Sequence, residues 1–456
     1  MKLQSLLLSF LMVFFGFYNL SCQELDVDGS IKIGSSTNTP TAGTIRWNDT
    51  TQDFEGFNGN EWLSLTKMKQ FGNTNNTESD KLTAGDAGAG DHFGWSVSID
   101  ADYACIGAPY DDVGATDWGS AYIFVRSGTT WSQQDKITAN DADANDYFGW
   151  SVSIDGDYAC IGAPLDDDGG SKSGSAYIFK RSGTSWSQQA KLTSNDADID
   201  DFFGRSVSIN GEYACIGAPY DDDNSVATGS TYIFKRSGTT WSQQAKLTAN
   251  DAELYDGFGI SVSISGDYAC IGTSGDDEGG LVNSGSAYIF KRSGTSWSQQ
   301  AKLIANDAST DDEFGLCVSI SGDYVCIGAP YDDDRGTNSG SAYIYSRSGN
   351  SWTQQAKLTT INAGAHDNFG ISVSISGDYA CIGAPFDDDG GTNSGSAYIF
   401  IRSGTFWTQL SKLKASDASA GDSFGRSVSI SSDHVCTGAP NDDGGASLSG
   451  SAYVFQ

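Results

Sequence analysis

A repeat of about 55 residues constrains the fold of this chain more than any other feature. A Phe-Gly pair marks the repeat, and its phenylalanines follow one another at intervals of 55 or 56 residues: Phe93, Phe148, Phe203, Phe258, Phe314, Phe369 and Phe424. Repeats of this length are typical of solenoids and propellers, and they take precedence over local predictions. One unit therefore accounts for the chain from about residue 80 to its end.

Each unit predicts four β-strands. In the unit that starts at Phe148, the stretches 148–154, 158–164 and 174–183 are rich in β-branched and aromatic residues, and short Gly-containing turns separate them. The stretch 186–194 is more polar, as expected of an outer edge strand. No segment has a long helical period. Four antiparallel strands in each of seven units predict an all-β fold, a seven-bladed β-propeller of four-stranded blades.

The two ends of the repeat region predict how the ring closes. After Phe424 the chain supplies only three strands before Gln456, while residues 80–91 resemble the fourth strand and following loop of the other units. Lys81 precedes Phe93 by the same interval that separates Lys136 from Phe148. We therefore expect an N-terminal strand to complete the seventh blade and pair otherwise open edges.

The first 22 residues predict a signal peptide. Lys2 precedes an apolar run from Leu6 to Phe17, and small residues follow. This run is short for a membrane span, and no later stretch could serve as one. Cys22 could be a lipoprotein cysteine, although Asn19-Leu20-Ser21 is a poor match to the usual preceding residues. We therefore expect an exported protein, either secreted or held at the cell surface, where an outer-membrane lipoprotein is one alternative.

The remaining sequence divides into three parts. Residues 23–66 predict a small β-rich module, because short apolar stretches alternate with Asn-Asp and Asn-Gly turns. Residues 67–79 form a polar linker, and residues 80–456 form the propeller. The role of the module and the oligomeric state stay open.

The repeat resembles the FG-GAP family, which includes the propeller of integrin α subunits and of bacterial surface proteins. Phe148-Gly149 and Gly162-Ala163-Pro164 carry the resemblance, and only the fourth unit departs from it, with Gly272-Thr273-Ser274. The resemblance implies a seven-bladed propeller whose loops meet partners. The calcium loop that some relatives carry between the first two strands is not carried over, because turns such as Asp155-Gly156-Asp157 are too short to wrap an ion.

Acidic residues concentrate in the loops that follow the second and fourth strands. In an up-and-down blade these loops share one face, so most of the chain's 58 acidic residues should lie there. The opposite face should carry Arg126, Arg181, Arg236, Arg292, Arg347 and Arg402. The loops after the second strands hold the candidate metal ligands Asp111, Asp112, Asp166, Asp167, Asp168, Asp221, Asp222, Asp223, Asp276, Asp277, Asp332, Asp333, Asp334, Asp387, Asp388, Asp389, Asp442 and Asp443.

Calcium is the cofactor that this pattern suggests. Ca²⁺ takes several carboxylate and carbonyl oxygens, and it would relieve repulsion among crowded carboxylates. The alternative is that Asp and Gly serve only as solvated turn formers.

The cysteines permit three interpretations. Cys105, Cys160, Cys215, Cys270, Cys326, Cys381 and Cys436 share one strand position, and by symmetry they lie in different blades. Blade spacing argues against bridges among them, and no second Cys or His repeats beside them to complete a metal site. We expect small buried side chains between blades. Cys317 differs, because a turn at Ser321-Gly322 would place it opposite Cys326 and permit a disulfide.

Charge and missing motifs limit the function. A net charge of −32 argues against nucleic acids and anionic membranes as partners. No nucleophile triad or phosphate loop is present, and nothing singles out two carboxylates as a glycosidase pair, so we expect no enzyme. A hydrolase or an enzyme accessory domain is the third alternative. The leading hypothesis is a module for adhesion or binding of an extracellular protein through the acidic face. The alternative is a carbohydrate-binding propeller, in which Trp131, Trp186, Trp241, Trp297, Trp352 and Trp407 stack on sugars instead of packing between blades.

Overall fold

The computed structural model describes residues 78–222, 227–360 and 362–456 in full, and the backbone of three short strands before them. The chain divides into two compact units, Met1–Thr74 and Asn75–Gln456. In the first unit an antiparallel sheet has the order β1 (Ile45–Asn48), β2 (Asp53–Phe57) and β3 (Trp62–Ser64). The predicted signal peptide and the proposed lipid-anchor cysteine, Cys22, lie outside the described residues.

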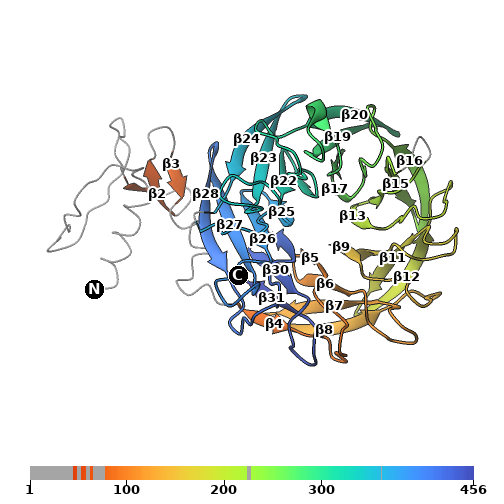
Figure 1. Ribbon diagram of the computed structural model, residues 1–456. Coiled ribbons are helices and arrows are strands. Elements are labelled where there is room, and N and C mark those ends of the chain that lie inside the picture. The colour runs from red at the N-terminus through yellow and green to blue at the C-terminus, as the bar shows by residue number, and fades with distance from the viewer. Residues whose placement is uncertain (1–44, 49–52, 58–61, 65–77, 223–226, 361) are drawn as a thin grey trace. The chain divides into compact units, whose positions relative to one another are not determined.

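The second unit is a ring of seven four-stranded antiparallel sheets, which confirms the predicted propeller (Figure 1). Blade 1 comprises β5 (Ser96–Asp100), β6 (Tyr103–Ala108), β7 (Ser120–Ser127) and β8 (Thr130–Ile137). Blade 2 comprises β9 (Ser151–Asp155), β10 (Tyr158–Ala163), β11 (Ser175–Ser182) and β12 (Ser185–Leu192). Blade 3 comprises β13 (Ser206–Asn210), β14 (Tyr213–Ala218), β15 (Ser230–Ser237) and β16 (Thr240–Leu247).

The next three blades repeat this order. Blade 4 comprises β17 (Ser261–Ser265), β18 (Tyr268–Thr273), β19 (Ser286–Ser293) and β20 (Ser296–Leu303). Blade 5 comprises β21 (Cys317–Ser321), β22 (Tyr324–Ala329), β23 (Ser341–Ser348) and β24 (Ser351–Leu358). Blade 6 comprises β25 (Ser372–Ser376), β26 (Tyr379–Ala384), β27 (Ser396–Ser403) and β28 (Phe406–Leu413).

Blade 7 combines the two ends of the repeat region, as predicted. Its strands are β29 (Ser427–Ser431), β30 (His434–Ala439), β31 (Ser451–Phe455) and the N-terminal β4 (Asp80–Leu82). β4 pairs with β31 in antiparallel fashion, and Lys81 lies opposite Tyr453. The fourth strand of this blade thus comes from the beginning of the propeller sequence.

A ring of serines joins the inner strands of neighbouring blades. In each blade the middle serine of the first strand accepts a hydrogen bond at 3.0–3.1 Å from an isoleucine N–H of the next blade. The seven pairs are Ser98–Ile154, Ser153–Ile209, Ser208–Ile264, Ser263–Ile320, Ser319–Ile375, Ser374–Ile430 and Ser429–Ile99. The last pair links blade 7 to blade 1, so these hydrogen bonds run around the whole ring.

The repeated Phe-Gly and Gly-Ala-Pro residues meet where two blades touch. Phe148 is fully buried, and Gly149 donates its N–H to the Gly162 carbonyl at 3.0 Å with a φ of +95° that favours glycine. A Cβ atom at Gly162 would lie 2.0 Å from the carbonyl oxygen of Gly204 in the next blade. Both glycines are therefore needed for the close approach of one blade to the next.

The cysteines that recur on the second strands are buried between blades, as predicted. Cys105 packs in one cluster with Ile123 of its own blade and with Val152 and Ile154 of the next. All seven are fully buried free thiols. Burial raises the pKa of the Cys105 thiol far above its usual value, so this group stays protonated at neutral pH.

The predicted disulfide between Cys317 and Cys326 is wrong. The turn consists of Gly322 and Asp323, between the paired residues Ser321 and Tyr324. The strand register therefore differs by two residues from the register that a disulfide would require. Cys317 therefore lies opposite Gly328, while Cys326 lies opposite Ser319, and both thiols are free. The Cys317 Sγ atom instead accepts a hydrogen bond from the N–H of Val373 in the next blade at 3.3 Å.

Candidate binding face

The first carboxylate of every loop after a second strand is buried and is held by a tyrosine and a lysine. In blade 2, Asp166 accepts hydrogen bonds from Tyr177 Oη at 2.6 Å and Lys191 Nζ at 2.8 Å. The other six trios are Asp111–Tyr122–Lys136, Asp221–Tyr232–Lys246, Asp276–Tyr288–Lys302, Asp332–Tyr343–Lys357, Asp387–Tyr398–Lys412 and Asp442–Tyr453–Lys81. Burial alone would raise the pKa of Asp166, but the hydrogen bonds from Lys191 and Tyr177 hold that pKa below its usual value.

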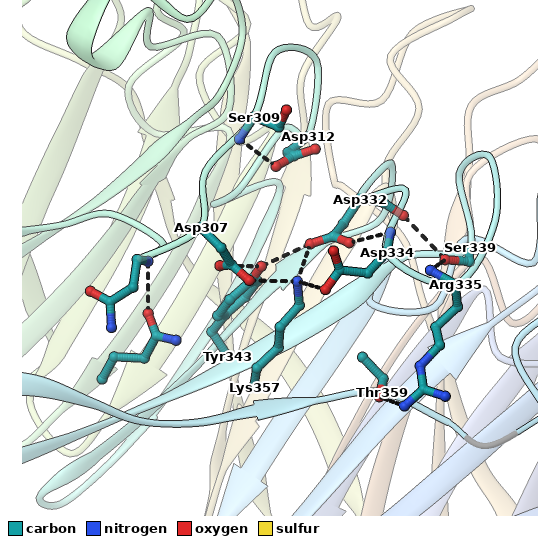
Figure 2. Close-up of polar contacts among 12 residues, drawn as sticks. Asp307, Ser309, Asp312, Asp332, Asp334, Arg335, Ser339, Tyr343, Lys357 and Thr359 are labelled. Carbon is teal, nitrogen blue, oxygen red and sulfur yellow. Dashed lines mark hydrogen bonds and ion pairs between the residues drawn. The ribbon is translucent and has the colours of Figure 1, made fainter.

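In blade 5 the lysine gathers two further carboxylates (Figure 2). Lys357 Nζ lies 2.7 Å from Asp332, 2.5 Å from Asp334 and 2.8 Å from Asp307, which comes from the loop that leads into the blade. Within the described residues these three aspartates form the only cluster whose ligand atoms could converge on one metal ion. As arranged, the cluster does not fit Ca²⁺, because the ammonium group already lies among the three carboxylates. Calcium binding by the acidic loops stays a prediction.

The remaining candidate ligands are divided among the loops of separate blades. The second carboxylate of six loops accepts a backbone N–H from its own loop, and these residues are Asp112, Asp167, Asp277, Asp333, Asp388 and Asp443. Asp168 and Asp389 contact the lysines of their blades. Asp223 lies outside the described residues. The structure therefore brings those predicted ligands that it describes to one face, but many of their carboxylates are used to shape and neutralise the loops.

A second set of buried aspartates lies in the loops that follow the fourth strands. Asp312, for example, accepts the N–H of Ser309 at 2.7 Å. Burial raises the pKa of Asp146, Asp201, Asp256 and Asp312 to about 6, and the nearby first carboxylate of the next loop adds to the effect through repulsion. These four groups therefore change charge at mildly acidic pH.

Five of the six arginines predicted on the opposite face form ion pairs with aspartates. Arg181 forms an ion pair with Asp157 of the short turn in its own blade, and its guanidinium carbon lies 4.3 Å from the ring centre of Tyr103 in the preceding blade. Arg126, Arg292, Arg347 and Arg402 also form ion pairs with the equivalent turn aspartates.

The tryptophans that open the fourth strands pack between blades. Trp186 is buried, and its Nε1 donates a hydrogen bond at 3.0 Å to Gln134 of the preceding blade. Trp131 and Trp241 are buried as well. The packing interpretation is therefore confirmed for these three side chains, and they are not platforms for sugars.

Exposed apolar side chains collect on the acidic loops. Of the large hydrophobic residues that the structure describes as exposed, only Phe406 lies at the opposite face. The others lie in loops after second or fourth strands: Val113, Ile199, Tyr220, Leu254, Tyr255, Leu281, Val282, Ile304, Phe386 and Leu448. Most of them fall between the end of β12 and the start of β21, in the loops of blades 3 and 4 and those that flank them.

The seven units match the FG-GAP repeat, at residues 77–124, 131–179, 186–234, 241–290, 297–345, 352–400 and 407–455. The chain belongs to the FG-GAP repeat family. Each FG-GAP unit begins at the fourth strand of one blade and ends within the third strand of the next. This offset by one strand is the reason that the first FG-GAP unit must lend β4 to the last blade.

Other comparisons add little to this assignment. A crystal structure of the Saccharomyces cerevisiae protein Sqt1 is similar with a TM-score of 0.45 and 9% identity, over 83% of this chain and 98% of that one. None of the curated proteins compared with the chain matches it. Within the described residues no helix has the length and apolar character needed to cross a membrane.

Sequence reasoning missed the lysines that hold the acidic loops. Lys81, Lys136, Lys191, Lys246, Lys302, Lys357 and Lys412 recur with the repeat period, and this regularity is the signal that could have identified them. The polar sequence of the fourth strands does not by itself indicate that the lysine of each strand contacts a buried aspartate.

Proposed function

We propose that this FG-GAP propeller is an exported, non-enzymatic module that binds a protein partner through its acidic loops. Two features support the proposal: the family, whose propellers are generally protein-binding and typically extracellular, and the chemistry of the loop face. In this proposal the binding serves adhesion at the cell surface.

The observation that carries the proposal is the concentration of exposed apolar side chains on the acidic loops of neighbouring blades. Ile199, Leu254 and Tyr255 have exposed fractions of 60%, 55% and 69%. Exposed apolar residues that cluster within a charged rim are typical of protein interfaces, whereas scattered ones are ordinary. A partner would bury these side chains at its centre, and its basic residues would meet the surrounding aspartates.

Paired variants test the proposal. We expect Leu254→Ser combined with Tyr255→Ser to abolish capture of surface proteins by the immobilised chain, because aromatic and aliphatic anchors dominate interface energy. Phe406→Ser is the matched control, since Phe406 is 68% exposed at the opposite face. A glycan array is run in parallel with the same proteins.

Loss of capture in the loop variant alone would support the proposal. Equal capture by the wild-type chain and both variants would contradict it. Specific glycan binding that the loop variant loses would instead favour the carbohydrate-binding alternative.

A further inference from the structure

The residue that follows each Phe-Gly pair comes immediately before the inner strand of a blade, at the end that faces the acidic loops. In three blades this residue is aliphatic: Ile260, Leu316 and Ile371. In the four consecutive blades 3, 2, 1 and 7 it is Arg205, Trp150, Trp95 and Arg426. Because the inner strands contact one another in a closed ring, these four side chains lie together around the propeller axis. We call them the axial cluster.

The axial cluster has an ordered geometry. The guanidinium carbon of Arg205 lies 4.9 Å from the ring centre of Trp150, and that of Arg426 lies 4.8 Å from the ring centre of Trp95. The two indole rings are 4.9 Å apart and tilted by 52°. Each tryptophan of the pair thus has one guanidinium over its ring, and these cation–π contacts fix the positions of both arginines.

Neither guanidinium forms an ion pair with a carboxylate of the described residues. This contrasts with Arg181 and Arg347, which have turn aspartates as partners. Burial lowers the pKa of Arg205 to about 10, and repulsion from Arg426 adds to the shift. A guanidinium group is not deprotonated in proteins, so both arginines stay charged at neutral pH. Two partly exposed cations without anionic partners are unexpected in a chain with a net charge of −32.

Rigid aromatic residues border the axial cluster. Tyr110 lies 5.6 Å from Trp95, and it also packs against His92 and Tyr147, each at 5.1 Å between ring centres. The Trp150 Nε1–H group is buried and has no hydrogen-bond acceptor among the described residues. The site therefore offers guanidinium donors beside fixed apolar surface, a combination suited to a planar carboxylate.

The acidic loops around this site limit the ligand further. Asp112 and Asp200 are exposed members of these loops and Asp117 is half-buried, and all three would repel a ligand that carries many negative charges. A single anionic group surrounded by neutral or positive charge fits this pattern. We propose that Arg205 and Arg426 bind one carboxylate of a peptide segment whose neighbouring residues are basic. This inference rests on the proposed function, because it names the chemistry of the protein partner at the axis.

Calorimetric titration of the full chain at low salt tests the inference. The probe is acetyl-Lys-Ala-Asp-Ala-Lys-amide, and the matched control has Asn in place of Asp. We expect the Asp peptide to bind at least about tenfold more tightly, the factor associated with a charge-assisted hydrogen bond. Arg205→Gln combined with Arg426→Gln should remove this preference, while Arg335→Gln, which changes an exposed arginine elsewhere on the same face, should keep it.

Three results would overturn the inference: equal affinity for both peptides, a preference that survives in the double variant, or tighter binding of a trigalacturonate probe than of the Asp peptide. The last result would assign the site to acidic polysaccharides. Melting curves of the variants show whether they are folded, and Arg205→Lys with Arg426→Lys supplies a second pair that keeps the charge but loses the planar fork. Failure here with intact dependence of capture on Leu254 and Tyr255 would contradict the axial site and leave the proposed function standing.

Discussion

At the scale of single residues, one lysine in each blade determines how a buried aspartate keeps its charge. The side chain of Lys357 is 18% exposed, and that of Asp332 is only 4% exposed. Removal of the lysine leaves a buried carboxylate without its counter-ion, which is far more costly than loss of a surface ion pair.

We expect Lys357→Met to lower the free energy of unfolding by about 3 kcal/mol, because a broken buried pair leaves an uncompensated charge. Calcium should then raise the melting temperature of this variant more than that of the wild-type chain, since the three carboxylates around the vacated position can accept a hard cation. Melting in millimolar calcium and in EDTA at matched ionic strength measures both effects. Equal calcium shifts in the two proteins would contradict the account, and the wild-type shift tests the original calcium prediction.

A second prediction at this scale concerns pH. The pKa of Asp312 is raised to about 6, against an ordinary value of 3.8, so the folded chain holds this proton more tightly than the unfolded chain does. The resulting stabilisation is complete below 3.8 and is lost as the pH rises through 6. Asp312→Asn should therefore raise the melting temperature at pH 7.5 and have little effect near pH 4.5. Asp143→Asn, at an exposed position of the equivalent loop before blade 2, is the control. A variant that is no more stable than the wild-type chain at pH 7.5 would contradict this interpretation.

At the scale of elements, the contact between blades depends on backbone approach as much as on side-chain packing. Gly162→Ala places a methyl carbon 2.0 Å from the Gly204 carbonyl oxygen of the next blade, so one blade must shift. We expect a loss of about 3 kcal/mol in unfolding free energy, at the upper end for overpacked sites. Gly183→Ala is the control: its Cβ would meet nothing within 4 Å, and only its φ of +65° adds a cost of about 1 kcal/mol. Denaturant titration compares the two, and equal losses would contradict the proposed contact.

The elements also show which features sequence reasoning could reach. The strand positions and the burial of the cysteines could be predicted from the repeat period and the polarity of the sequence. Each repeat position occurs seven times, each time in an equivalent environment. The pairing of Cys317 was wrong, because a turn displaced by one residue moves the register by two, and composition alone does not locate the turn. The lysines were missed because their reach to Asp166 and its equivalents depends on where the loop folds back over the blade. The role of Arg205 and Arg426 was not predicted either, because the repeat position that they occupy holds Trp, Ile or Leu in the other blades.

At the scale of the whole molecule, ring closure joins distant parts of the chain. Lys81 of β4 lies 2.6 Å from Asp417 and 3.1 Å from Asp442, and Leu82 is buried in the core of the blade junction. The same strand thereby supplies the seventh lysine of the acidic face and the last hydrogen-bonded edge. The closed ring was predictable, because the seventh unit lacks a strand that residues 80–91 match.

Hydrogen exchange in β31 (Ser451–Phe455) is the most direct measurement of this closure. Two truncated chains are compared with the full chain: one begins at Asn75, the boundary between the two compact units, and the other begins at Thr83, immediately after β4. We predict that the first keeps the protection of β31 and the melting temperature of the full chain, and that the second loses protection across β31 and melts at a lower temperature. Unchanged exchange in the chain that lacks β4 would contradict a propeller closed by its N-terminal strand.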